Sequence, residues 1–128
     1  MTFKLKTALV AAAILVAAPA AAQQSNYVAA AYSKDTGNVG FATGHSEDSV
    51  KTTALSECQT GGASDCVVAI AGPDMCISLA RATNKNRLGL GGGATRADSQ
   101  SKAMSECAQN DAQGCNIHDT YCAPETIR

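Results

Sequence analysis

Aromatic and charged residues are scarce in this 128-residue chain. It has no tryptophan, two phenylalanines, three tyrosines and two histidines, and only 16% of its residues are charged. The chain has eleven acidic and ten basic residues, a balance that does not supply the clustered positive surface needed for phosphate contacts. We therefore expect no nucleic-acid partner. Apolar residues make up 45% of the chain, well above the level at which chains stay unfolded. The composition predicts one small domain with a core of small aliphatic side chains.

Several motifs of catalytic and cofactor-binding proteins are also missing. No Cys-x-x-Cys pair occurs, which argues against a thioredoxin-like redox site and against covalently attached haem. No Gly-x-Ser-x-Gly elbow of a hydrolase is present. The nearest approach to a zinc site is Cys115-x2-His118-x3-Cys122, but cysteines that are oxidised to disulfides cannot ligate a metal. We therefore expect no metal and no cofactor.

The first 22 residues have the three parts of a cleavable signal peptide. Lys4 and Lys6 form a positive region, residues 9–18 form an uninterrupted apolar run, and the alanines at 20–22 are the small residues that a signal peptidase accepts. The apolar stretch is shorter than the roughly 20 residues that cross a bilayer, so no membrane span is expected after cleavage. We expect cleavage before Gln23 and a mature protein in the periplasm or outside the cell. Removing Lys4 and Lys6 leaves eight basic and eleven acidic residues, a net charge of about −3.

An internal duplication with an offset of 49 residues is the most informative feature of the chain. Residues 54–58, Ala-Leu-Ser-Glu-Cys, return as residues 103–107, Ala-Met-Ser-Glu-Cys, and the same offset relates Gly40 to Gly89. Stacked repeat arrays generally need three or more copies, whereas only two fit in this chain. The duplication predicts a single domain over residues 23–128, made of two copies at about 27–75 and 76–124.

Both copies show the same order of expected elements, which is strand, strand, helix and strand. In the first copy we expect strands at 27–33, 38–43 and 66–71. In the second copy we expect strands at 76–83, 87–91 and 115–121, with a hairpin turn at 84–86. Short connections between such elements favour an α+β fold in which a mainly antiparallel sheet carries the two helices on one face. The continuous apolar run at 66–71 indicates a central strand that is covered on both faces.

The two expected helices begin at residues that can cap them. Ser46 caps the first and Thr95 the second, since a side-chain oxygen at this position accepts a free backbone N–H. The apolar periodicity predicts one buried stripe on each helix. The expected stripes are Val50, Ala54 and Cys58 in the first helix, and Ala97, Ser101, Met104 and Ala108 in the second.

Six cysteines in an exported chain predict three disulfides, because the compartment is oxidising and the count is even. Fifteen pairings are possible. One interval of eight residues occurs at the same place in both copies, and we expect this identical interval to be the covalently closed one. The predicted bridges are Cys58–Cys66 and Cys107–Cys115, each tying a helix end to the next strand, and Cys76–Cys122, joining the two copies.

Two local patterns look like functional motifs and have simpler structural explanations. Residues 89–94 match the dinucleotide-binding pattern G-x-G-x-x-A between a strand and a helix. The first copy keeps the outer glycines, Gly40 and Gly44, and loses the inner ones, which favours a role in backbone geometry. Residues 45–48, His-Ser-Glu-Asp, contain the residue types of a Ser-His-acid set, but a nucleophile and its base come together through folding, and helix capping explains the same four residues.

Several segments of the chain, taken together, resemble a known family. They are residues 27–33 (YVAAAYS), the two helix ends that finish in Cys58 and Cys107, residues 66–68 (CVV), and the glycine-rich segment 91–97 (GGGATRA). Over nearly the whole mature chain this pattern resembles the domain of unknown function 4189 family. The resemblance implies a small exported bacterial protein with a duplicated helix-Cys motif and carries no catalytic residues. Members often have tryptophans near the first strand and the glycine-rich segment, where this chain has Tyr27, Phe41 and Leu90.

We expect the protein to be a non-catalytic binding module whose partner is a protein or an anionic component of the cell envelope. A rigid domain with three disulfides loses little entropy on docking, which favours binding over chemistry. Two alternatives remain open. One is an inhibitor or immunity-type protein that acts on a secreted hydrolase, and the other is a small hydrolase that uses His45 or His118.

A binding surface is expected where the two copies differ, because the fold already explains the shared positions. The hairpin tip of the second copy differs sharply from that of the first. Arg81, Lys85 and Arg87 place three cations within seven residues of an otherwise acidic chain. This positive patch is the candidate site for an acidic partner.

Overall fold

The computed structural model describes residues 25–83, 87–109 and 113–128. The signal peptide that the sequence predicts for residues 1–22 lies outside these ranges, and so do Lys85 and the turn at 84–86.

Two similar units follow one another along the chain, and each has the order strand, strand, helix, strand. The first unit contains β1 (Tyr27–Tyr32), β2 (Val39–Gly44), α1 (Glu47–Gln59) and β3 (Val67–Pro73). The second unit contains β4 (Met75–Arg81), β5 (Leu88–Gly93), α2 (Arg96–Cys107) and β6 (Asn116–Ala123). The α+β class and the duplicated unit are therefore confirmed.

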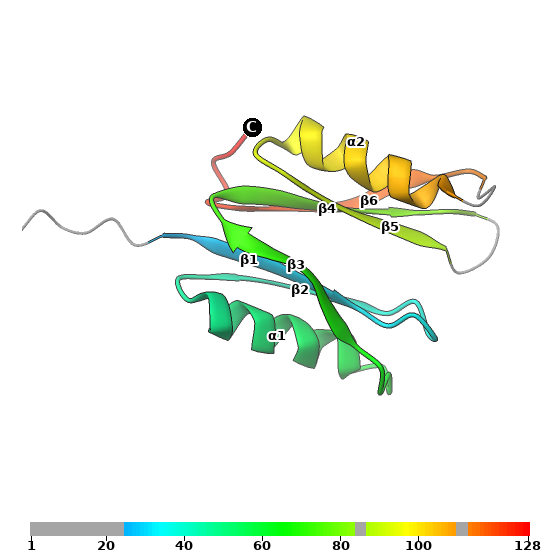
Figure 1. Ribbon diagram of the computed structural model, residues 1–128, viewed down its shortest axis with the longest axis horizontal. Coiled ribbons are helices and arrows are strands. Elements are labelled where there is room, and N and C mark those ends of the chain that lie inside the picture. Colours follow the sequence, from blue (N-terminus) through cyan, green and yellow to red (C-terminus); the bar gives the residue numbers. More distant parts are fainter. Residues whose placement is uncertain (1–24, 84–86, 110–112) are drawn as a thin grey trace, which may run out of the picture.

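Each unit forms its own three-stranded antiparallel sheet, with strand orders β2-β1-β3 and β5-β4-β6. The two sheets stack face to face, and α1 and α2 cover the outer faces (Figure 1). This four-layer arrangement differs from the single sheet with both helices on one face that the sequence suggested. The reason is that the third strand of each unit returns to pair with the first, so neither sheet continues into the other.

The strands at the centres of the sheets are β1 and β4, and the apolar run of β3 is an edge strand instead. The expectation of a central strand at 66–71 was therefore wrong. β3 is apolar because its side chains are shared between two layers: Ala71 packs toward α1, and Ile70 packs into the space between the sheets. Both third strands contain a bulge at the same place, which leaves Ala69 and His118 without a directly opposite residue.

The core between the sheets is built by alternation along the central strands. Val28 and Ala30 of β1 face the opposite sheet and meet Ile77 of β4, whereas Ala29 and Ala31 face α1. All five of these residues are fully buried. Larger side chains, Phe41, Ile70, Met75 and Leu90, close the edges of this layer.

Glycines on β2 and β5 face the helices and leave no room for a side chain there. A Cβ atom on Gly40 would overlap the carbonyl oxygen of Ala54 in α1, and one on Gly89 would overlap the carbonyl oxygen of Ala103 in α2. A Cβ on Gly91 would likewise overlap backbone atoms of α2. The glycine pattern at 89–94 is thus explained by close packing of strand and helix, as the duplication indicated.

The buried stripe of α2 is not the predicted one. Ser99, Ala103 and Cys107 are buried, and they are the offset counterparts of Val50, Ala54 and Cys58 in α1. Of the four residues expected there, Ala97, Ser101 and Ala108 are exposed and Met104 is half-buried. The apolar pattern was misleading because a serine occupies the position of Val50.

Ser99 belongs to a group of three hydroxyl residues, Ser78, Ser99 and Thr120, which we call the hydroxyl cluster. Ser78 Oγ lies 2.7 Å from Ser99 Oγ and 2.9 Å from Thr120 Oγ1. Ser99 Oγ also donates to the carbonyl oxygen of Arg96 at 2.9 Å. The first unit has Ala29, Val50 and Ala71 at these three positions, so the same layer is apolar there.

Disulfides join Cys58 to Cys66, Cys107 to Cys115, and Cys76 to Cys122, the same pairs that the sequence predicted. The first two tie a helix end to the start of β3 or β6. The third does not join the copies, because Cys76 and Cys122 are directly opposite each other on β4 and β6 of the second unit. The offset of 49 relates them to Tyr27 and Pro73, which are opposite each other on β1 and β3.

Among the described residues, neither helix is long and apolar enough to span a membrane.

Candidate binding grooves between the two sheets

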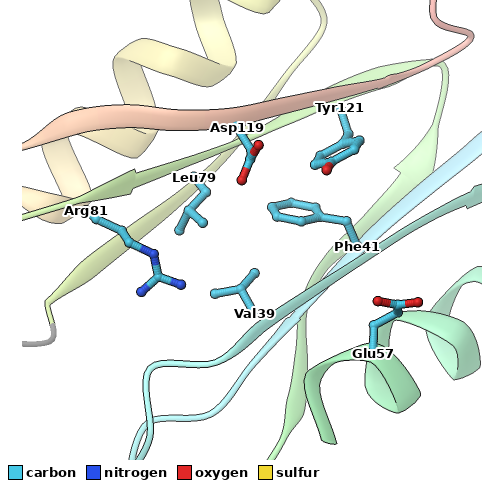
Figure 2. A pocket seen from close by; sticks show the side chains of 7 residues that line it. All are labelled: Val39, Phe41, Glu57, Leu79, Arg81, Asp119 and Tyr121. Atoms are coloured by element: carbon cyan, nitrogen blue, oxygen red, sulfur yellow. The ribbon is translucent and has the colours of Figure 1, made fainter. Parts of the chain in front are cut away.

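The stacked sheets leave two grooves, one along each long edge of the sandwich. On one edge β2 lies beside β6, and on the other β3 lies beside β5. We call the first the polar groove. It has a volume of about 240 Å³ and is lined by Val39, Phe41, Glu57, Leu79, Arg81, Asp119 and Tyr121 (Figure 2).

An aromatic pair connects the two units at the polar groove. Phe41 of β2 and Tyr121 of β6 have ring centroids 4.6 Å apart and an interplanar angle of 31°. Tyr121 remains 41% exposed, so one part of the pair is available to a ligand. Leu79 of β4 is almost fully buried and forms an apolar part of the wall.

Arg81 stands at the end of β4 and reaches across to the first unit. Its Nη2 donates a hydrogen bond to the carbonyl oxygen of Gly37, in the turn between β1 and β2, at 3.0 Å. This bond uses one of the five N–H groups of the guanidinium, so the side chain retains donors for a ligand. Arg81 therefore both fastens the two units together and brings a positive charge to the groove.

Two carboxylates complete the polar groove. Asp119 of β6 points into it between Leu79 and Phe41, and Glu57 comes from α1 (Figure 2). Neither forms an ion pair within the described part of the chain, where the salt bridge present is Lys51–Glu47 on the exposed surface of α1. The groove thus combines an aromatic surface with charges of both signs that are not neutralised by one another.

The second groove is the counterpart of the first under the internal duplication. It has a volume of about 260 Å³ and is lined by Tyr32, Ala69, Ile70, Leu88, Gly89, Leu90 and Glu106. We call it the apolar groove. Its Leu88, Leu90 and Glu106 are the offset counterparts of Val39, Phe41 and Glu57.

The two grooves differ at three positions that the fold does not require to be polar. Arg81 corresponds to Tyr32, Asp119 to Ile70, and Tyr121 to Gly72. Arg81 has a structural role through its bond to Gly37, whereas Asp119 forms no ion pair within the described part of the chain and occupies a position that is Ile70 in the other unit, so stability alone does not explain Asp119. This divergence was readable from the sequence by comparing the copies position by position, but only the structure shows that the three positions lie in one groove.

The positive patch predicted from sequence is divided between the two edges. Arg81 lines the polar groove, whereas the exposed Arg87 lines a cavity next to the apolar groove. Lys85 lies outside the described residues. Binding of an acidic partner by this patch stays a prediction.

The Ser-His-acid residues at 45–48 have the helix-capping geometry expected of them. Ser46 Oγ accepts a hydrogen bond from the backbone N–H of Ser49 at 3.3 Å, and in the second unit Thr95 Oγ1 accepts one from Asp98 at 3.1 Å. Within the described residues no hydrogen bond joins His45 to Ser46, and His118 is exposed on β6.

Asp65, which belongs to no motif recognisable in the sequence, anchors the turn after β1. Its carboxylate accepts hydrogen bonds from Ser33 Oγ at 2.5 Å and from the backbone N–H of Asp35 at 3.1 Å. The hydrogen bond from Ser33, followed by that from Asp35, lowers the pKa of Asp65 below its usual value. This turn also supplies the Gly37 carbonyl that Arg81 binds, so Asp65 supports one end of the polar groove.

The cysteines of the zinc-like pattern are both consumed by bridges, since Cys115 is joined to Cys107 and Cys122 to Cys76. Among the described residues no three histidine, cysteine or acidic side chains converge on a point where a metal could bind.

No curated protein and no solved structure matches the chain. A family model does match, over residues 27–122, which is most of the chain and includes both units and both grooves. The chain belongs to the family described as domain of unknown function (DUF4189).

Proposed function

We propose that this protein is an exported, non-catalytic binding module and that the polar groove is its contact surface. The observation that carries the proposal is the difference between two grooves that share one backbone plan. One groove has Arg81 and Asp119 where the other has Tyr32 and Ile70, and Gly72 is the first-unit counterpart of Tyr121. A ligand that contacts Asp119 and the remaining N–H donors of Arg81 best explains why these charges occur in a groove whose counterpart is built without them.

The charges of the polar groove favour a protein partner over a polyanionic envelope polymer. Arg81 contributes one positive charge, and Asp119 and Glu57 contribute two negative ones. A polyanion would be repelled by the carboxylates, whereas a protein surface can present groups of both signs. The Phe41–Tyr121 pair adds the kind of aromatic surface that is enriched at protein interfaces.

The rigidity of the domain supports binding without chemistry. Each unit has a disulfide between helix and strand, and the second unit has a further one between its strands. Such a framework reduces the ordering entropy that docking would otherwise cost. Three disulfides in a chain of this size are also typical of oxidising compartments, which supports export to the periplasm or beyond.

The test replaces groove residues with the residues that the duplicated fold already accepts. The mature domain, residues 23–128, is immobilised as wild type and as the double variant Arg81→Tyr, Asp119→Ile, and both are exposed to envelope extract. A control variant, Lys51→Gln, changes a charge on the outer surface of α1 to the residue found at the equivalent position of α2.

We expect proteins that the wild type and the control retain to be released by the double variant, with circular dichroism showing that the variant is folded. Recovery of the same proteins by wild type and double variant at equal yield would overturn the proposal. Retention of polysaccharide or lipid in place of protein would also contradict it.

A further inference from the structure

We propose that the apolar groove is a second site, which binds an extended peptide through an apolar side chain followed by a carboxylate. Lys34 and Arg87 would hold the carboxylate, and the aliphatic wall of the groove would hold the side chain. This inference concerns a different edge of the sandwich from the polar groove and does not depend on the function proposed for that groove.

The apolar groove adjoins a further cavity. Tyr32, Leu88 and Glu106 line both this groove and an adjoining cavity of about 380 Å³ that is also lined by Lys34 and Arg87. The two cavities share these three residues, so they are neighbours, with aliphatic side chains lining the first and two cations lining the second.

The cations come from both units. Lys34 lies in the exposed turn after β1, and Arg87 is exposed just before β5. Their offset counterparts are Thr83 and Asn38, so the fold does not need a charge at either place. Among the described residues that line this cavity, Lys34 and Arg87 are the cations and Glu106 is the carboxylate, so these side chains together carry a net positive charge.

The aliphatic end suits a side chain of moderate size. Ile70, Leu88 and Leu90 line it, and none of the three is fully buried, so each retains apolar surface that a ligand can cover. Covering apolar surface contributes roughly 25 cal/mol per Å². A small aliphatic side chain such as valine suits the limited apolar surface that these residues leave accessible.

The edges of the sheets favour a peptide over an acyl chain. β3 is the outer strand of one sheet and β5 that of the other, and within the described residues neither has a strand partner on its outer side. Outward backbone N–H and C=O groups at such an edge can pair with an extended peptide, as in strand addition. An acyl chain has no hydrogen-bond donor or acceptor that could pair with these backbone groups.

The probe for this site is an N-acetylated Ala-Val-Ala-Val tetrapeptide with a free carboxyl terminus, compared with the same tetrapeptide ending in an amide. Binding to the mature domain is followed by two-dimensional amide NMR at low ionic strength. Two variants are compared with the wild type. One is Lys34→Thr with Arg87→Asn, and the other is Lys51→Gln with Lys102→Thr, which removes the same charge from the outer helices.

We expect the acid peptide to shift the amides of Leu88, Leu90 and Ile70, and to bind about tenfold more tightly than the amide, since charge-assisted hydrogen bonds are among the strong ones. The Lys34 and Arg87 double variant should lose this preference, and the helix variant should keep it. Added salt should weaken the acid peptide more than the amide, because exposed charges are screened.

Several results would overturn the proposal. They are equal binding of acid and amide, an unchanged preference in the Lys34 and Arg87 variant, no amide shift at millimolar peptide, or saturation by decanoate where the peptide fails. Shifts confined to the polar groove would also contradict it. None of these results bears on capture of a partner by Arg81 and Asp119, so the two proposals fail separately.

Discussion

Replacing Gly89 with alanine should destabilise the protein strongly, although the change adds only a methyl group. The new Cβ would overlap the carbonyl oxygen of Ala103 and the backbone nitrogen of Cys107, and would lie 3.0 Å from Cys107 Cα. All three are backbone atoms of α2, so the helix must move away from the sheet as a unit. Overpacking of this kind costs roughly 1–3 kcal/mol and occasionally more, and we expect about 3 kcal/mol because no flexible side chain can yield.

The matched control is Gly44→Ala. Its Cβ would meet only the Val50 side chain, at 3.1 Å, which can give way by a few tenths of an ångström. Alanine also reduces the conformational entropy of the unfolded chain relative to glycine, which stabilises the folded protein by about 0.4–1 kcal/mol. The free energy of unfolding of the control should therefore change by less than about 1 kcal/mol in either direction.

Urea unfolding followed by circular dichroism measures both variants. With a slope of about 1–3 kcal/mol per molar urea, Gly89→Ala should lower the midpoint by roughly 1 M or more, and Gly44→Ala should shift it much less. Equal midpoints for the two variants would refute the argument that close approach of α2 to β5 requires this glycine.

Three further predictions concern the hydroxyl cluster, the Asp65 anchor and the strand-to-strand disulfide. Ser78→Ala removes the central member of the hydroxyl cluster and should lower the free energy of unfolding in urea by about 1–2 kcal/mol. Changing all three members to the apolar residues of the first unit should recover at least half of that free energy. The hydrogen bond from Ser33 lowers the pKa of Asp65 in the folded protein. This bond therefore stabilises the fold fully above the usual aspartate pKa of about 3.9. Its stabilisation is lost as the pH falls through the lower pKa of the folded state. The stability of the wild type should therefore fall more steeply than that of Asp65→Asn between about pH 4 and pH 2, and parallel curves would count against the anchor. Replacing Cys76 and Cys122 by alanine should lower the free energy of unfolding by about 4 kcal/mol, because this bridge closes a loop of 46 residues. Removing either bridge between cysteines eight residues apart should lower it by about 2.5 kcal/mol. The opposite ranking of urea midpoints would contradict this chain-entropy estimate.

The sequence predicts the repeating unit well because the signals for it are local. Ser46 and Thr95 cap their helices as expected, and the strands begin and end within a few residues of their predicted limits. The equal spacing of Cys58–Cys66 and Cys107–Cys115 leads to the observed pairs because both span the same helix-to-strand connection.

Errors arise where burial depends on the arrangement of whole layers. The apolar run in β3 resembles a central strand because Ile70 and Ala71 pack into two different layers, yet strand order places β3 at an edge, where Val67 is exposed. Ser99 is buried in the position of Val50, where a hydroxyl partner on Ser78 makes a polar residue acceptable. Hydrophobic periodicity cannot show such a partner, since the two serines are far apart in the sequence.

The grooves could not be derived from the sequence either, because they exist only where two separate sheets stack. Arg81, Asp119 and Phe41 come from three strands and two units, and no local pattern links them. The duplication contains the relevant signal, since it shows which positions differ between the copies. It becomes informative once the structure shows which of those positions face the same space.

Site-specific photo-cross-linking in living cells tests the central claim that the polar groove is the contact surface. A benzophenone amino acid is placed at position 39, on the wall of the polar groove, and at position 102, on the outer helix α2. We predict a discrete cross-linked protein adduct from position 39 that disappears when Asp119→Ile is added, and no such adduct from position 102. An adduct of equal yield from both positions, or one at position 39 that is unaffected by Asp119→Ile, would contradict the account.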